Sequence, residues 1–148
     1  MNAADWIQTL LLVVTIVGLM ITIFYNRRQL QIFNDQLKLN FFADYTKRYQ
    51  QIMLHLPEDI IDDDFDYDVL SEEKRKTTLK HMRIYFNLCS EEYELWNNGY
   101  IEKRIWDNWK AGIEFAMTKK AFRDAWERTK QDAIYHEDFR KWIDSHGL

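Results

Sequence analysis

Basic side chains are concentrated in the stretch KRKTTLKHMR, which begins at Lys74. In and just after this stretch, four residues suited to contact a nucleotide recur at spacings of four, three and four: Lys76, Lys80, Arg83 and Asn87. On a helix this spacing places all four on one face, called here the basic stripe. The ordinary explanation of such a cluster is a solvated helix surface, balanced by the acidic residues that precede it.

Two functional interpretations compete with a solvated surface. The stripe could lie on anionic lipid headgroups, where each base contributes about 1 kcal/mol. Alternatively, copies of the stripe could converge on a phosphate-bearing ligand at the axis of a symmetric oligomer, with Asn87 or Tyr85 contacting a base. We predict the second arrangement, in which the three basic residues contact phosphate. Duplex nucleic acid is not expected as a partner, because the net charge is −4 and no broad basic surface is evident.

The acidic stretch before the stripe has the spacing of a calcium loop. From Asp62 it is DDDFDYDVLSEE, with aspartates at positions 1, 3, 5 and 7 and Glu73 at position 12, where an EF-hand loop places oxygen ligands. Position 6, however, is Tyr67 instead of the glycine that the sharp turn requires. Pro57 also ends the preceding helix early. We expect a solvated acidic loop and no metal site, with calcium as the alternative.

Catalytic motifs find little support. The four histidines have no HxxxH or HExxH spacing, and neither a Gly-rich phosphate loop nor a Gly-x-Ser-x-Gly elbow occurs. The Arg-x5-His spacing of helical HEPN ribonucleases occurs twice, at Arg75–His81 and Arg140–His146, which shows how easily it arises by chance. Lysine follows both arginines, where a small polar residue is expected. We therefore predict no enzyme and no cofactor.

The N-terminal stretch WIQTLLLVVTIVGLMITIFYN, from Trp6 to Asn26, contains no charged residue. As a helix it would be about 30 Å long, at ~1.5 Å per residue, which matches the hydrocarbon core of a bilayer. Trp6 and Tyr25 lie at its two ends, where amphipathic aromatic residues favour the headgroup level. A cleaved signal peptide is not expected, since MNAAD has an acid and no base and the run does not end in Ala-x-Ala. The stretch predicts one transmembrane helix.

Charge sets the expected orientation. Asp5 is the only charged side chain before the span, whereas Arg27 and Arg28 follow it directly. Because Lys and Arg stay on the cytoplasmic side, we predict a protein of the inner (cytoplasmic) membrane with its N-terminus outside. The expected domains are 1–26, tail and transmembrane helix, and 27–148, a cytoplasmic domain. Cys89, the one cysteine, agrees with a reducing compartment.

The scarcity of helix-breaking residues favours an all-α fold, because the chain has only one proline and four glycines. Nothing breaks a helix between Gly18 and Pro57, so the span is expected to continue into the cytosol. Ser71 is the predicted N-cap of the next long helix, and Asn97-Asn98-Gly99 is its predicted stop.

Three shorter helices complete a predicted cytosolic bundle of about four to five helices. The first covers about 101–117, Thr118 caps the second, and the last carries Trp142. Five tryptophans lie between Trp96 and Trp142, and we expect them to form a bulky core.

The segments FFADYTKRYQQIMLHLPEDI (41–60) and YFNLCSEEYELWNNGYIEKRIWDNWKAGIEFAMTKKAFRDAWE (85–127) carry a family resemblance. The chain resembles small bacterial proteins with one N-terminal span and a Trp-rich helical cytosolic domain, some of which lie among phage-defence genes. Its plan is also similar to that of membrane effectors of type III CRISPR systems, which bind a cyclic oligoadenylate and perturb the membrane. The resemblance implies an antiviral, nucleotide-gated effector, and it assigns no site residue.

The sequence therefore predicts a non-enzymatic membrane effector that forms a homo-oligomer, binds a cyclic nucleotide such as cyclic oligoadenylate, and perturbs the lipid bilayer. A lone span cannot make a pore, so this hypothesis requires an oligomer. The alternative is a membrane-tethered adaptor, whose bundle docks a protein partner and whose span only localises it.

Overall fold

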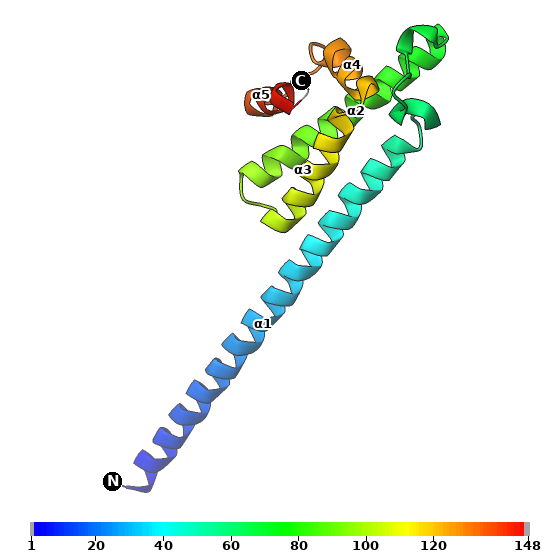
Figure 1. Cartoon of the computed structure of the whole chain (residues 1–148). Helices are drawn as coiled ribbons and strands as arrows, with labels where there is room; N and C mark the ends of the chain where they lie inside the picture. Colours follow the sequence, from blue (N-terminus) through cyan, green and yellow to red (C-terminus); the bar gives the residue numbers. More distant parts are fainter. Residues whose placement is uncertain (1, 147–148) are drawn as a thin grey trace. The chain divides into compact units, whose positions relative to one another are not determined.

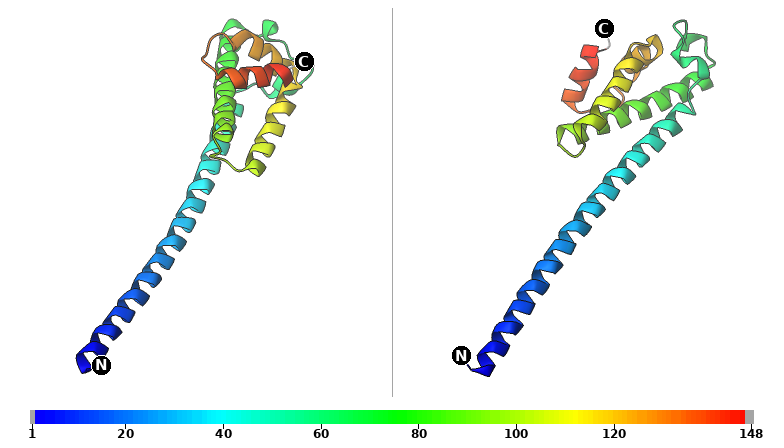
Figure 2. Two further views of the ribbon diagram at one scale, coloured as in Figure 1. Left: turned by 90° about the vertical axis from the view of Figure 1, so that its left-hand side faces the viewer. Right: turned by 60° about the horizontal axis from the view of Figure 1, so that its bottom comes forward.

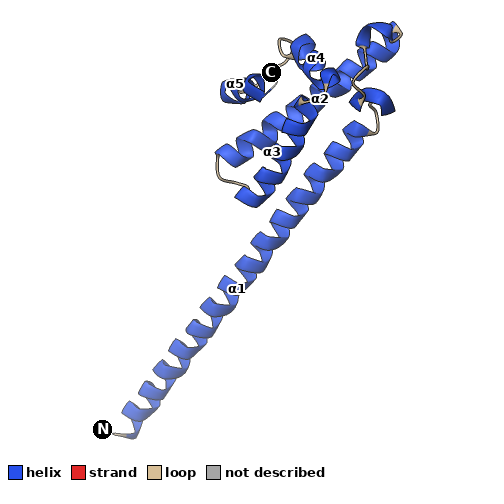
Figure 3. Cartoon of the chain, in the orientation of Figure 1, coloured by secondary structure: helices blue, strands red, loops and turns tan. Residues whose placement is uncertain are grey.

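The computed structural model describes residues 2–146, all of whose regular structure is helical (Figure 3). The predicted all-α fold is confirmed, with five α-helices and two short 3-10 helices among the described residues. The elements are α1 (Ala3–Met53), η1 (Glu58–Ile61), η2 (Tyr67–Val69), α2 (Glu72–Asn97), α3 (Lys103–Met117), α4 (Lys120–Thr129) and α5 (Glu137–His146).

The chain divides into two compact units, Met1–Ala43 and Asp44–Leu148. Helix α1 is continuous from Ala3 to Met53 and contributes residues to both units. The predicted boundary after residue 26 is the expected edge of a membrane, which the division into compact units does not test, so it stays a prediction.

Among the described residues one helix, α1, is long and apolar enough to cross a membrane. None of the side chains in its apolar window is buried, whereas the core helix of a soluble protein would be mostly buried. The threonine hydroxyls of this apolar stretch donate hydrogen bonds to the backbone carbonyl four residues earlier, at 2.8–2.9 Å, in Thr9, Thr15 and Thr22. This is expected for hydroxyls in an apolar helix. The predicted candidate span is therefore present, while its orientation stays a prediction.

In the second unit α2 is central, and α3, α4 and α5 all pack against it (Figures 1 and 2). Its predicted ends are confirmed. The Ser71 side chain accepts a hydrogen bond from the Lys74 backbone N–H at 3.4 Å, and Gly99 follows the helix with φ +73°. A left-handed residue directly after a helix is commonly glycine, because a side chain at that φ is strained.

Aromatic side chains fill the core of the domain. Trp126 is 2% exposed and its ring lies 5.0 Å from Phe86 and 6.0 Å from Phe139 between centroids. Its indole N–H donates to an Asp144 carboxylate oxygen at 2.7 Å, so its polar atom is satisfied. The predicted tryptophan core is thus confirmed for Trp126, and also for Trp106, which is 3% exposed, but it is wrong for Trp96, which is 37% exposed.

The predicted role of Thr118 is wrong. Thr118 has helical backbone angles and closes α3, where its hydroxyl donates to the Phe115 carbonyl at 2.7 Å. Lys119 is the N-cap of α4 and makes no side-chain capping bond. The one residue between the α3 cap and the start of α4 is a lysine, whose side chain has no oxygen to accept a hydrogen bond from the first N–H groups of α4.

The last turns of α1 belong to the core of the second unit. Tyr45 stacks on Trp109 with ring centroids 5.4 Å apart, and Tyr49 lies 6.4 Å from Tyr85. Tyr45 and Ile52 are 8% and 6% exposed. These contacts fix the end of α1 to the domain that follows it in the sequence.

Candidate functional site

Helix α2 carries the basic stripe on its exposed side, as the spacing predicts. Lys76, Lys80 and Asn87 are exposed, and Arg83 is half-buried. Two of the three bases already have acidic partners within the chain: Lys76 contacts Glu72 at 2.5 Å, and the Arg83 Nε lies 3.7 Å from Asp132. The structure thus places the four residues along one face, but it gives them partners that a phosphate would have to replace.

Asn87 lies in different surroundings from the three bases. It lines an open groove of about 730 Å³ with Tyr45 of α1, the carboxylates of Glu91 and Glu94 in α2, and Glu137 of α5. No Lys or Arg lines this groove among the described residues. Carboxylates repel phosphate, so Asn87 is less suited to an anionic ligand than the basic end of the stripe.

The groove has a polar interior that the sequence did not predict. The Tyr135 hydroxyl is buried without a hydrogen-bond partner, and Tyr135 is 6% exposed. Glu94 lies 3.1 Å from the His136 imidazole, and Glu91 accepts a hydrogen bond from Arg48 at 2.8 Å. Sequence patterns could not reveal this groove, because its walls come from the end of α1, from α2 and from the residues around 135.

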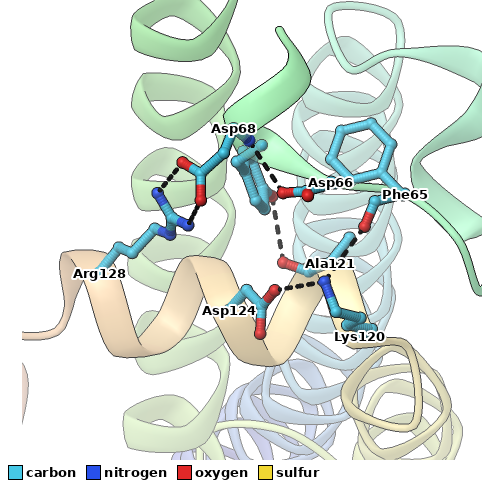
Figure 4. A network of polar contacts seen from close by, with 8 residues as sticks. Phe65, Asp66, Asp68, Lys120, Ala121, Asp124 and Arg128 are labelled. Carbon is cyan, nitrogen blue, oxygen red and sulfur yellow. Dashed lines mark hydrogen bonds and ion pairs between the residues drawn. The ribbon is translucent and has the colours of Figure 1, made fainter.

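The acidic stretch contacts α4 through the segment around Asp68, as Figure 4 shows. Arg128 donates two hydrogen bonds to the Asp68 carboxylate at 3.1 and 3.0 Å, and this contact lowers the pKa of Asp68. Asp66 accepts a hydrogen bond from the Asp68 backbone N–H at 2.9 Å. These two carboxylates therefore have partners within the protein.

Tyr67 occupies position 6 of the calcium-loop spacing and is fully buried. Its hydroxyl donates to the Ala121 carbonyl at 3.1 Å, and burial raises its pKa. A buried tyrosine anchored on α4 replaces the glycine turn of a calcium loop. Among the described residues, no group of three or more His, Cys, Asp or Glu side chains is arranged to hold a metal ion.

A buried polar cluster lies where the end of α1 meets α2. Burial raises the pKa of the Glu92 carboxyl to about 8, which nearby Arg48 offsets only in part. Burial also raises the pKa of the Cys89 thiol well above its ordinary value. The Cys89 thiol is therefore protonated and closed to solvent, the opposite of a catalytic cysteine.

In the HEPN-like pair Arg75–His81, the histidine ring contacts other residues of the protein. The His81 ring stacks on His55 with centroids 4.8 Å apart, and its Nδ1 lies 2.9 Å from the Thr77 carbonyl. Arg75 lies 3.7 Å from Asp68. The side chain of His146, in the second pair, lies outside the described residues.

Two surfaces of α2 are thus candidates for binding, the basic stripe and the acidic groove. No protein-family model, curated protein or solved structure matches the chain. The function is therefore inferred from the residues themselves.

Proposed function

We propose that the chain is a non-enzymatic membrane effector, anchored by α1 with its helical domain in the cytosol. Copies assemble in one membrane, and a ligand bound by the domains shifts the packing of the membrane helices. The observation that carries the proposal is the continuity of α1, which includes the apolar candidate span and also Tyr45 and Ile52 of the domain core.

A continuous helix is better suited to transmit a ligand-induced change from the domain to the membrane than to serve only as a tether. A tether only has to limit distance, and a flexible linker with Gly and Ser does this well. Here no Gly or Pro interrupts α1 between Gly18 and its last residue, so the helix that holds the candidate span also supplies residues of the domain core. A ligand moves such a system only if it binds one arrangement more tightly than the other.

The ligand class that we propose is a cyclic nucleotide such as cyclic oligoadenylate. Its phosphates would contact Lys76, Lys80 and Arg83, and Asn87 would contact a base. The support is the shared face and the exposure of Lys76 and Lys80. Phosphate would replace Glu72 at Lys76 and Asp132 at Arg83, so binding costs two surface ion pairs, each worth about 0–1 kcal/mol. The defence role comes with the family resemblance.

The test is native mass spectrometry of the full chain in lipid nanodiscs, alone and with cyclic di-, tri- and tetranucleotides. The proposal predicts a discrete oligomer that retains nucleotide. The double variant Lys80→Glu/Arg83→Glu should lose binding by reversing two charges of the stripe. A monomer that retains none of the nucleotides would reject the proposal.

The matched control is Lys103→Glu/Lys141→Glu. Both lysines lie outside the basic stripe, and each is exposed and paired with an acid four residues away, as Lys76 is. The control makes the same change in net charge, so it separates a specific site from general attraction of anions. Equal loss of nucleotide binding in both double variants would show that the basic stripe is not the specific binding site.

The groove favours a second candidate function, the membrane-tethered adaptor. Its carboxylates, Glu91, Glu94 and Glu137, suit a cationic segment of a partner protein better than a nucleotide. The adaptor predicts that an arginine-containing peptide binds the nanodisc-embedded chain and is lost on Glu94→Lys, with no requirement for an oligomer.

A further inference from the structure

Beyond the predicted span, α1 continues with large apolar side chains exposed. Leu30, Phe33 and Leu37 are 60%, 55% and 49% exposed, and they recur at spacings of three and four. This spacing places them on one face of the helix, called here the apolar stripe. Three such side chains in water leave a contiguous apolar surface that needs a cover.

The bilayer does not reach the whole of this stripe. The uncharged stretch ends at Asn26, and at ~1.5 Å per residue Leu37 lies about 16 Å further along the helix. The interfacial layer of one leaflet is only about 5–8 Å deep. Lipid headgroups can therefore contact Leu30, whereas Leu37 projects beyond them.

We infer that the apolar stripe is the contact surface for the same stripe of a second copy, in a parallel helix pair. The inference rests on the membrane anchoring of the proposed function, and it does not depend on a ligand. Copies inserted in one membrane with one orientation carry Leu30, Phe33 and Leu37 at the same height. Each stripe therefore meets an identical stripe, as an isologous contact requires.

The charge pattern favours a second copy of the chain as the partner of the apolar stripe. Asp35 is the only charged residue between Leu30 and Leu37, and at ~100° per residue it lies on the opposite side of the helix from the stripe. Two identical stripes can thus approach without placing like charges against each other. The neighbouring positions are uncharged, among them Gln31, Asn34 and Gln36.

Cysteine cross-linking in proteoliposomes tests the contact with the full chain. Single cysteines replace Leu30, Phe33 or Leu37, and the matched controls are Gln31→Cys and Asp35→Cys. The native chain supplies the background, because its one thiol, at Cys89, is 1% exposed. Intact tryptophan fluorescence of each variant shows that the helical domain is folded.

Mild oxidation should form dimers at the stripe positions at least about tenfold faster than at the controls. Cysteines that face each other at a helix seam come within disulfide distance, whereas those on the outer sides of helices ~8–10 Å apart do not. Equal rates on both faces, or thiols that react with maleimide but do not cross-link, would overturn the inference in favour of lipid or another protein as the cover.

The outcomes separate this inference from the proposed gating. Cross-links at the stripe without any nucleotide response would support the contact and remove the gated effector. A chain that binds nucleotide but gives no stripe cross-links and remains a monomer in nanodiscs would remove the contact and leave ligand recognition standing.

Discussion

Replacing Glu92 by glutamine is expected to stabilise the helical domain at neutral pH. Glu92 is 7% exposed, and burial raises its pKa from 4.5 to about 8. The folded domain therefore keeps the proton that the unfolded chain loses above pH 4.5. Since the unfolded state then binds fewer protons, stability falls as pH rises from about 4.5 to about 8 and is level above that.

The size of the effect follows from the two pKa values. Each pH unit between them costs the native protein about 1.4 kcal/mol, so the penalty reaches about 3 kcal/mol at pH 7 and about 5 kcal/mol above pH 8. Glutamine has nearly the same shape and does not ionise. The Glu92→Gln variant should therefore match the native protein near pH 4.5 and exceed its stability by about 3 kcal/mol at pH 7.

Urea unfolding of the nanodisc-embedded chain at pH 5, 7 and 8.5 measures this difference through tryptophan fluorescence, because Trp106 and Trp126 lie in the core. The control is Glu127→Gln, whose side chain is 64% exposed and pairs with Lys130 at 2.7 Å. It should change stability by less than about 1 kcal/mol at every pH. Equal stability of Glu92→Gln and the native protein at pH 7 and 8.5 would mean that Glu92 is ionised in the folded domain, and would refute the reasoning.

Two further substitutions test local structure by the same urea assay. Tyr67→Phe should lose about 1 kcal/mol, because it removes the buried hydrogen bond that the Tyr67 hydroxyl donates to the Ala121 carbonyl at 3.1 Å; unchanged stability would show that this hydrogen bond makes no net contribution to folding. Gly99→Ala should lose about 1 kcal/mol through strain at φ +73°, since nothing within 4 Å would clash with the new Cβ. Gly99→Asn should be tolerated better than Gly99→Ala, and the reverse order would contradict the assigned conformation.

Features set by neighbouring residues could be predicted from the sequence. Ser71 and Gly99 define the ends of α2 because capping depends on side chains and backbone angles within one turn. The same local logic failed at Thr118, since a threonine hydroxyl can satisfy a carbonyl of the helix it ends as well as an N–H of the helix that follows.

Features that depend on residues far apart in the sequence could not be predicted. The groove brings together Tyr45, Asn87 and Tyr135, and no spacing rule connects them. The acidic partners of Lys76 and Arg83 also differ in this respect: Glu72 is four residues away and could have been predicted, whereas Asp132 is brought to Arg83 only by folding. Burial of Glu92 did leave a signal, because it falls four residues after Leu88 on the same face of α2.

The enclosed position of Cys89 gives the protein a built-in reporter. It is the only thiol of the chain, so a thiol reagent added to native membranes labels the protein only when the domain opens around α2. The labelling rate then measures the free energy of that opening without any engineered probe. A ligand that binds only the closed domain slows labelling by the factor 1 + [L]/Kd. Candidate nucleotides and cationic peptides can thus be compared in the membrane by how much each slows the labelling of Cys89.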